Sequence, residues 1–111
     1  MGAATVRGRL PVEVVQRVVR MHFGPFRLCY DKGLAKDPRL GGRLVTSFVI
    51  DPQGAASGVA DAGSDLPDAD VAACVRRGFA SLTFPPPESG AVTVVYPITF
   101  EPADAPPPPP P

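Results

Sequence analysis

The sequence has little of the chemistry on which catalytic and metal sites depend. It contains one histidine, two cysteines and no tryptophan. A Ser-His-Asp or Cys-His arrangement would have to use His22, and nothing in the sequence suggests a partner for it. We expect a partly buried structural histidine instead. Two cysteines and one histidine are also too few ligands for a closed zinc site. The sequence therefore predicts no enzyme activity, no catalytic residue, no metal and no cofactor.

Signatures of other ligands are missing too. Acidic residues gather near a turn and a helix start without the terminal glutamate of a calcium loop, so their expected roles are N-capping and solvation. They are Asp61, Asp65, Asp68 and Asp70. The glycines form no phosphate-cradling loop. The arginines at positions 17, 20 and 27 are sparse and lack stacking aromatics, so we expect no nucleic acid. No apolar stretch reaches the roughly 18–20 residues that span a bilayer, so this domain is not expected to insert into a membrane.

Charge is balanced overall but unevenly distributed. Residues 1–43 carry nine basic and three acidic side chains, about +6, and residues 44–111 carry two basic and eight acidic ones, about −6. A polarised domain could attract an acidic partner through its basic part. Because the basic residues are scattered along the helices, the sequence favours the other reading, in which the two parts neutralise each other across the fold.

A chain of 111 residues supports one domain. Residues 1–10 read as a lead-in or a short strand, and residues 11–101 as the folded domain. Residues 102–111 end in a run of prolines, which favours extended chain and builds no core, so we expect a disordered tail.

Three segments show helical spacing of apolar residues. The first covers residues 11–23, and Gly24-Pro25 is expected to break it. The second covers residues 25–36, and the third covers residues 68–82. Their apolar stripes include Val12, Val15 and Val19, then Phe26, Cys29 and Tyr30, then Val71, Cys74, Val75 and Phe79.

Three segments read as strands. Residues 43–51 are apolar on both faces, which predicts a central strand. Residues 55–62 form a weak partner, in which Gly58 suggests a bulge or an edge. Residues 91–100 contain Pro97, which gives up a ladder hydrogen bond and belongs on an edge. The sequence thus predicts an α+β domain with a three-stranded antiparallel sheet, in the order second-first-third strand, and with the helices on one face.

The two cysteines, Cys29 and Cys74, each fall on an apolar helical stripe over the same small sheet, so their sulfurs could meet. Three readings stay open. The pair forms a structural disulfide in an oxidising compartment, or remains as two buried thiols, or is redox-active. The last is disfavoured by the absence of a Cys-x-x-Cys motif.

Short motifs spread over residues 8–101 carry a family resemblance. They are Arg27-Leu28-Cys29-Tyr30-Asp31, Leu40-Gly41-Gly42-Arg43, Phe48-Val49-Ile50-Asp51-Pro52-Gln53-Gly54, Val71-Ala72-Ala73-Cys74-Val75, Phe84-Pro85 and Val94-Val95-Tyr96-Pro97-Ile98-Thr99-Phe100. Together they resemble the AgmX/PglI C-terminal domain family, a branch of TonB C-terminal-like domains known from gliding-motility proteins. The resemblance implies a periplasmic domain at the end of a longer, membrane-anchored envelope protein. No signal peptide is recognisable, so a targeting segment would lie upstream.

In TonB-like domains the last strand offers its edge to an extended segment of a partner. The resemblance therefore implies a protein–protein interaction module that couples an inner-membrane complex to an outer-membrane or cell-wall partner by β-augmentation. The side chains expected to read the partner are Val92, Val94, Tyr96 and Ile98. The alternative is a structural envelope domain that self-associates, as a homodimer, through the same edge. A thiol redox domain is the third hypothesis.

Overall fold

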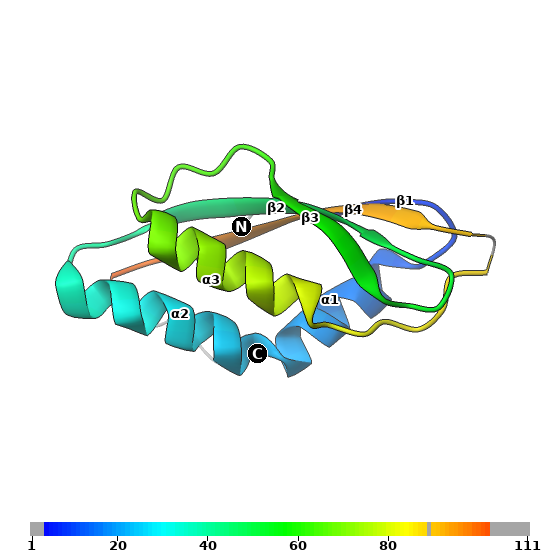
Figure 1. The fold of residues 1–111 in the computed structure, drawn as a ribbon, viewed down its shortest axis with the longest axis horizontal. Helices are drawn as coiled ribbons and strands as arrows, with labels where there is room; N and C mark the ends of the chain where they lie inside the picture. Colours follow the sequence, from blue (N-terminus) through cyan, green and yellow to red (C-terminus); the bar gives the residue numbers. More distant parts are fainter. Residues whose placement is uncertain (1–3, 89, 103–111) are drawn as a thin grey trace.

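A computed structural model describes residues 4–88 and 90–102 of the chain, which form an α+β fold. Three helices cover one face of a four-stranded antiparallel sheet (Figure 1). The elements in chain order are β1 (Thr5–Arg7), α1 (Val12–Met21), α2 (Phe23–Lys36), β2 (Gly42–Ile50), β3 (Ala56–Asp61), α3 (Ala69–Ala80) and β4 (Val92–Phe100). Residues 103–111, most of the predicted tail, lie outside the described residues.

The sheet has one strand more than the sequence predicts. Its order is β1-β4-β2-β3, so the predicted order of the three longer strands is right but β1 lies outside β4. The placement of residues 91–100 at an edge is therefore wrong for the first half of β4. A strand of three residues is too short to show period-two alternation, and only pairing with β4 across the fold defines it.

Strand β2 lies in the interior of the sheet, as its two apolar faces indicate. It pairs with β4 over nine residues, from Gly42 opposite Phe100 to Ile50 opposite Val92. Its pairing with β3 shifts register between Ser47 and Val49. Gly58 has a φ of 58° at this irregularity, a conformation that favours glycine. The weak strand thus contains the predicted bulge.

The junction between α1 and α2 falls at His22, three residues before the proline expected to break the helix. Pro25 lies in the first turn of α2, where its missing N–H costs little. His22 is exposed, and its Nδ1 donates to the carbonyl oxygen of Val18 at 2.9 Å. The expectation of a partly buried histidine is therefore wrong, because the helix ends at His22 and its ring turns back over the last turn.

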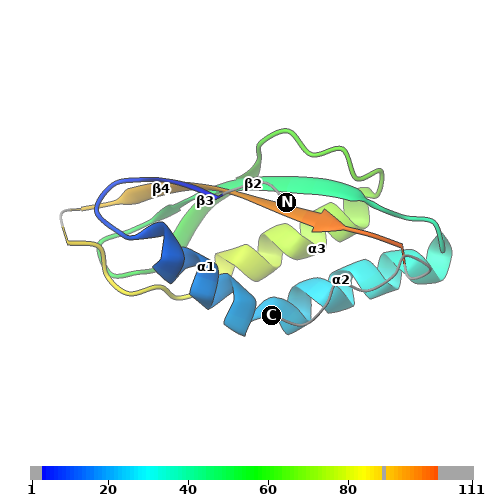
Figure 2. The same cartoon turned by 180° about the vertical axis from the view of Figure 1, so that it is seen from behind.

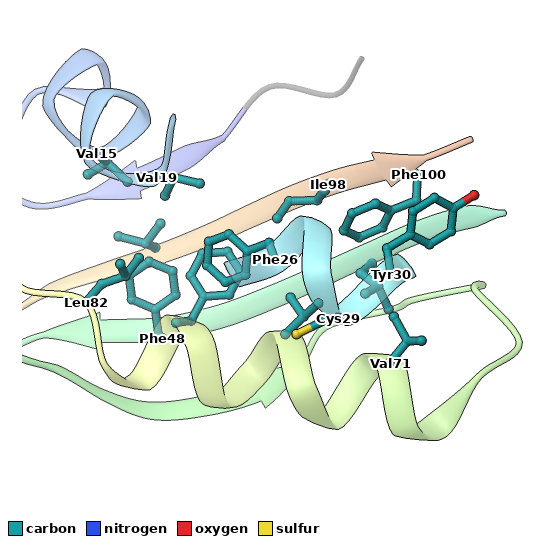
Figure 3. Close-up of a cluster of buried hydrophobic side chains, with 14 of the residues drawn as sticks. Val15, Val19, Phe26, Cys29, Tyr30, Phe48, Val71, Leu82, Ile98 and Phe100 are labelled. Atoms are coloured by element: carbon teal, nitrogen blue, oxygen red, sulfur yellow. The ribbon is translucent and has the colours of Figure 1, made fainter. Parts of the chain in front are cut away.

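The core lies between the sheet and the helices and is rich in aromatic rings (Figure 3). The ring of Phe79 from α3 lies 4.7 Å from that of Phe26 and 5.2 Å from that of Phe48. These three side chains have at most 1% of their surface exposed. Burial of such rings supplies the main driving force that holds α2 and α3 against the sheet.

Candidate binding edge on strand β4

The two sides of β4 differ in how fully they are paired. On one side β2 pairs with all nine residues, and on the other β1 pairs only with Thr93, Val94 and Val95. Figure 2 shows β1 alongside the first part of the β4 arrow. Among the described residues, no strand pairs with the outer side of Tyr96–Phe100. This uncovered stretch is called the free edge below.

The direction of the backbone polar groups follows from Val45, which lies opposite Pro97. The N–H of Val45 donates to Ser64 Oγ at 2.9 Å, and its carbonyl accepts from Ala62 at 2.7 Å. Both groups therefore point away from β4. Directly opposite residues of antiparallel strands either exchange both backbone hydrogen bonds or exchange none. Because Val45 directs neither group toward β4, it exchanges none with Pro97, and the backbone polar group of Pro97 points to the outer side of β4. Alternate residues share this direction: Thr93, Val95, Pro97 and Thr99.

Hydrogen-bonding capacity along this outer side is therefore limited. Thr93 and Val95 lie opposite Arg7 and Thr5, so their groups are used by β1. Pro97 has no N–H. Within the described part of the chain, the free edge is left with one donor, the Thr99 N–H, and with the carbonyl oxygens of Pro97 and Thr99. A proline can occupy a strand with neighbours on both sides because its nitrogen faces the free edge.

The four predicted reader residues all point toward the helices. Val92 and Val94 have 0% of their surface exposed, and Ile98 has 6%. Tyr96 is half-buried, with its ring 5.8 Å from that of Phe79. Val94 lies opposite Val6 of β1, and Val92 lies against Gly8, which follows β1. Only Tyr96 and Ile98 lie on the free edge.

Aromatic rings form the floor beneath the free edge on its helical side. Phe100 stacks on Tyr30 with ring centroids 4.7 Å apart and lies 6.2 Å from the ring of Phe23 (Figure 3). The hydroxyl of Tyr30 donates to the carbonyl of Leu40. Burial raises the pKa of Tyr96, and the positive charge of Arg20 opposes that shift. The floor thus combines apolar rings with one nearby cation.

A disulfide joins the two helices that support this floor. The sulfurs of Cys29 in α2 and Cys74 in α3 lie 2.01 Å apart, with the Cα atoms at 5.7 Å. Of the three readings that the sequence leaves open, the structure has the disulfide. Cys29 is 5% exposed. The bond fixes the distance between α2 and α3, and with it the position of the rings that α2 places under β4.

An ion-pair cluster links the C-terminal end of α2 to the N-terminal end of α3. Lys36 lies 3.5 Å from Asp68 and 3.3 Å from Asp70. The Asp68 carboxylate caps α3 by accepting from the N–H groups of Asp70 and Val71, so its predicted capping role is confirmed. The bond from Val71 and the charge of Lys36 hold the pKa of Asp68 below its usual value. Here the basic and acidic parts of the chain do neutralise each other.

The other acidic residues close loops. Asp61 accepts from the N–H of Gly63 and from the hydroxyl and N–H of Ser64, and these bonds lower its pKa. Asp65 accepts from the N–H of Arg43 at 2.6 Å. Among residues 4–88 and 90–102, no three histidine, cysteine or acidic side chains gather in a way that could hold a metal ion. In the same residues, no helix is both long enough and apolar enough to span a bilayer.

Among solved structures, the chain is similar to the solution NMR structure of the TonB C-terminal domain from Helicobacter pylori. The TM-score is 0.57, with 18% sequence identity over 86% of this chain and 87% of that one. This similarity shows a fold of the TonB C-terminal-domain type. No family model matches the sequence, and no curated protein matches it either. The AgmX/PglI resemblance therefore rests on the sequence motifs alone.

Sequence reasoning left two features of the outer side of β4 undetermined. It left residues 1–10 open between a lead-in and a short strand and did not pair them with Thr93–Val95, and it did not single out Thr99, which carries the one outward N–H of the free edge. The alternation of apolar residues identifies the face of β4 that is buried but not which neighbours flank it. Pro97 was the available signal, since it marks the part of the strand whose outer nitrogen needs no partner.

Proposed function

We propose that this domain is a periplasmic interaction module that binds an extended segment of an envelope protein by β-augmentation at the free edge. In this proposal it couples an inner-membrane complex to an outer-membrane or cell-wall partner, in a gliding-motility system of the AgmX/PglI kind. The observation that carries the proposal is the free edge itself, in a fold of the TonB C-terminal-domain type.

The edge determines what the partner must supply. Two carbonyl acceptors and one N–H donor face outward, so a bound strand has to offer two N–H groups against one carbonyl. A partner with proline at those two positions would be rejected. Side chains of the bound strand that point toward the helices would meet Tyr96, Phe100 and Phe23, so apolar residues are favoured there. Main-chain bonds thus provide affinity, and alternate side chains provide selectivity.

Tyr96 and Ile98 serve as reader residues in this proposal, since both lie on the free edge. Val92 and Val94 would contribute only where a partner strand extends past Val95. A periplasmic location is supported by the Cys29–Cys74 disulfide, because such bonds persist in oxidising compartments.

The test removes the one outward donor. Thr99→Pro deletes the Thr99 N–H and leaves every bond between β2 and β4 in place, and Thr99→Ala is the matched control that keeps the donor. Extended peptides from outer-membrane proteins are titrated into isotope-labelled domain and followed by NMR. We expect amide shifts along Tyr96–Phe100 and about tenfold weaker binding by Thr99→Pro, while Thr99→Ala binds as the wild type does. A complete lack of shifts there, or equal losses in both variants, would refute the proposal.

Two alternatives predict different results. Self-association through the free edge predicts a concentration-dependent dimer in sedimentation, with the same amide shifts on dilution and no peptide needed. A thiol redox function predicts an accessible, reactive sulfur. Cys29 is buried, which disfavours this function for its sulfur, and Cys74 is partly buried. Slow alkylation of both cysteines after reduction would reject the redox function.

A further inference from the structure

Strand β1 pairs with Thr93–Val95 on the outer side of β4, directly before the free edge. We infer that β1 is a displaceable internal occupant, which competes with the partner strand for the outer side of β4 and limits binding until it leaves. This inference rests on the proposed function and adds its regulation. It predicts two binding modes: a short one on Tyr96–Phe100 alone, and a long one on the whole of β4.

Few interactions attach β1 to the sheet. It makes two hydrogen-bonding residue pairs, Arg7 with Thr93 and Thr5 with Val95, whereas β2 faces β4 over nine residues. The side chains of Thr5 and Arg7 are exposed, and only Val6 packs against the core, where it is partly buried. Among the described elements, only β4 makes extensive contacts with β1. Few buried contacts and few main-chain bonds are the features of a segment that opens locally.

The residues after β1 keep it tethered when it leaves. Gly8 has a φ of 135°, and a Cβ atom built on it would lie 2.7 Å from Val92 Cγ2, so the chain crosses directly over Val92. Leu10 follows in the core, 8% exposed. Because these contacts lie outside β1, its release removes only the partly buried Val6 from the core and leaves Leu10 and α1 in place. A tethered strand also rebinds at high effective concentration, which makes it an efficient competitor.

Release of β1 changes what the edge can offer. With β1 in place, the outer side of β4 presents only the Thr99 N–H. Without it, the N–H groups of Thr93 and Val95 become available, and Val92 and Val94 come within reach of a bound strand. Strand β1 runs antiparallel to β4 with its first residue opposite Val95. A partner strand that grows along β4 from Phe100 therefore meets the end of β1 and has to displace it to extend further.

The first test needs no ligand. Amide hydrogen exchange is compared within β4 between Thr93 and Val95, which bond to β1, and Val94 and Tyr96, which bond to β2. We expect the first pair to exchange about tenfold faster or more, since only β1 has to open. Exchange of all four at one rate would overturn the inference, because β1 would then leave only when the domain unfolds.

The second test measures competition. The double variant Thr5→Pro with Arg7→Pro removes both N–H groups that β1 donates, and the control Thr5→Ala with Arg7→Ala removes the same side chains but keeps the donors. The probe is a synthetic peptide with the sequence of residues 4–10, followed by NMR shifts at Thr93–Val95. We expect the proline variant to bind it about tenfold more tightly than the control does.

Equal binding by the two variants, or no binding by either, would overturn the inference, since β1 would then not compete for the edge. The outcome is separable from the proposed function. If the peptide of residues 4–10 binds as expected but no envelope peptide binds either variant, the competition stands and the proposed partner class fails.

Discussion

At the scale of single residues, Gly78 of α3 makes a close helix contact with the ring of Phe26. A Cβ atom built on Gly78 would lie 2.6 Å from Phe26 Cε1, and the ring has 0% of its surface exposed. Glycine is therefore required for helix contact here and not for a special backbone conformation, because its φ is not positive. The sequence places Gly78 on the buried stripe of its helix. It does not reveal how closely the two helices approach, since that distance depends on packing across the fold.

Gly78→Ala is expected to destabilise the domain although alanine favours helices. The substitution gains about 1 kcal/mol of helix propensity but forces a methyl group into a filled core, at a cost of about 1–3 kcal/mol. We expect a net loss of about 1 kcal/mol in the free energy of unfolding, measured in urea. The control is Gly24→Ala in α2, which has no neighbouring atom within 4 Å. It should change stability by less than about 0.5 kcal/mol, because its helix gain is opposed by the following proline. A Gly78→Ala protein as stable as the wild type would contradict this.

At the scale of elements, the helices and the three longer strands follow from apolar periodicity and from glycine and proline positions. The boundary at His22 differs from the sequence prediction because the fold tolerates Pro25 inside the first turn of α2. The sequence left residues 1–10 open between a lead-in and a short strand and could not place β1 in the sheet, because three residues carry no periodic signal and the pairing involves residues nearly ninety positions away. Local pattern thus identifies the elements that bury a face, and it does not place an element held mainly by backbone bonds.

The disulfide between α2 and α3 is expected to be a main contributor to stability. It joins residues 45 positions apart, and the chain-entropy model gives about 4 kcal/mol for a loop of that length. We expect the double variant Cys29→Ser with Cys74→Ser to lose about that much in urea unfolding, and reductant to lower the stability of the wild type but not of the variant. Mass spectrometry of the unreduced protein checks the bond directly. Two free thiols there would remove the bond and with it the support for a periplasmic location.

At the scale of the whole molecule, the candidate site is a stretch of unpaired backbone at the edge of the sheet and not a cluster of reactive side chains. The sequence indicated β4 as the candidate strand and Pro97 as a residue that belongs at an edge. It could not indicate that β1 covers Thr93–Val95, and so it named Val92 and Val94 as readers although both are buried. Among the described residues β1 reaches no further along β4 than Val95, and Pro97 interrupts the row of outward donors at the next outward position. A single outward N–H is a weak template for unintended pairing between copies, which is how proteins protect exposed edges.

Pro97→Ala tests this reading of the whole edge. The new N–H would point outward, away from Val45, and would leave the β2–β4 bonds unchanged. Two N–H groups would then alternate with two carbonyls along the free edge, which is a complete template for a further strand. We expect the variant to fold, and the new amide at position 97 to exchange quickly in dilute solution. In sedimentation velocity the variant should form a concentration-dependent dimer more readily than the wild type does.

The control is Pro52→Ala, in the exposed turn between β2 and β3, which adds an N–H far from the free edge and should leave self-association unchanged. Thr99→Pro combined with Pro97→Ala should abolish the new dimer, because it removes the second donor. A slowly exchanging amide at position 97 in a monomeric Pro97→Ala variant would mean that this nitrogen faces β2. The outward direction inferred for the edge groups would then be wrong, and the binding site would have to be sought elsewhere on the sheet.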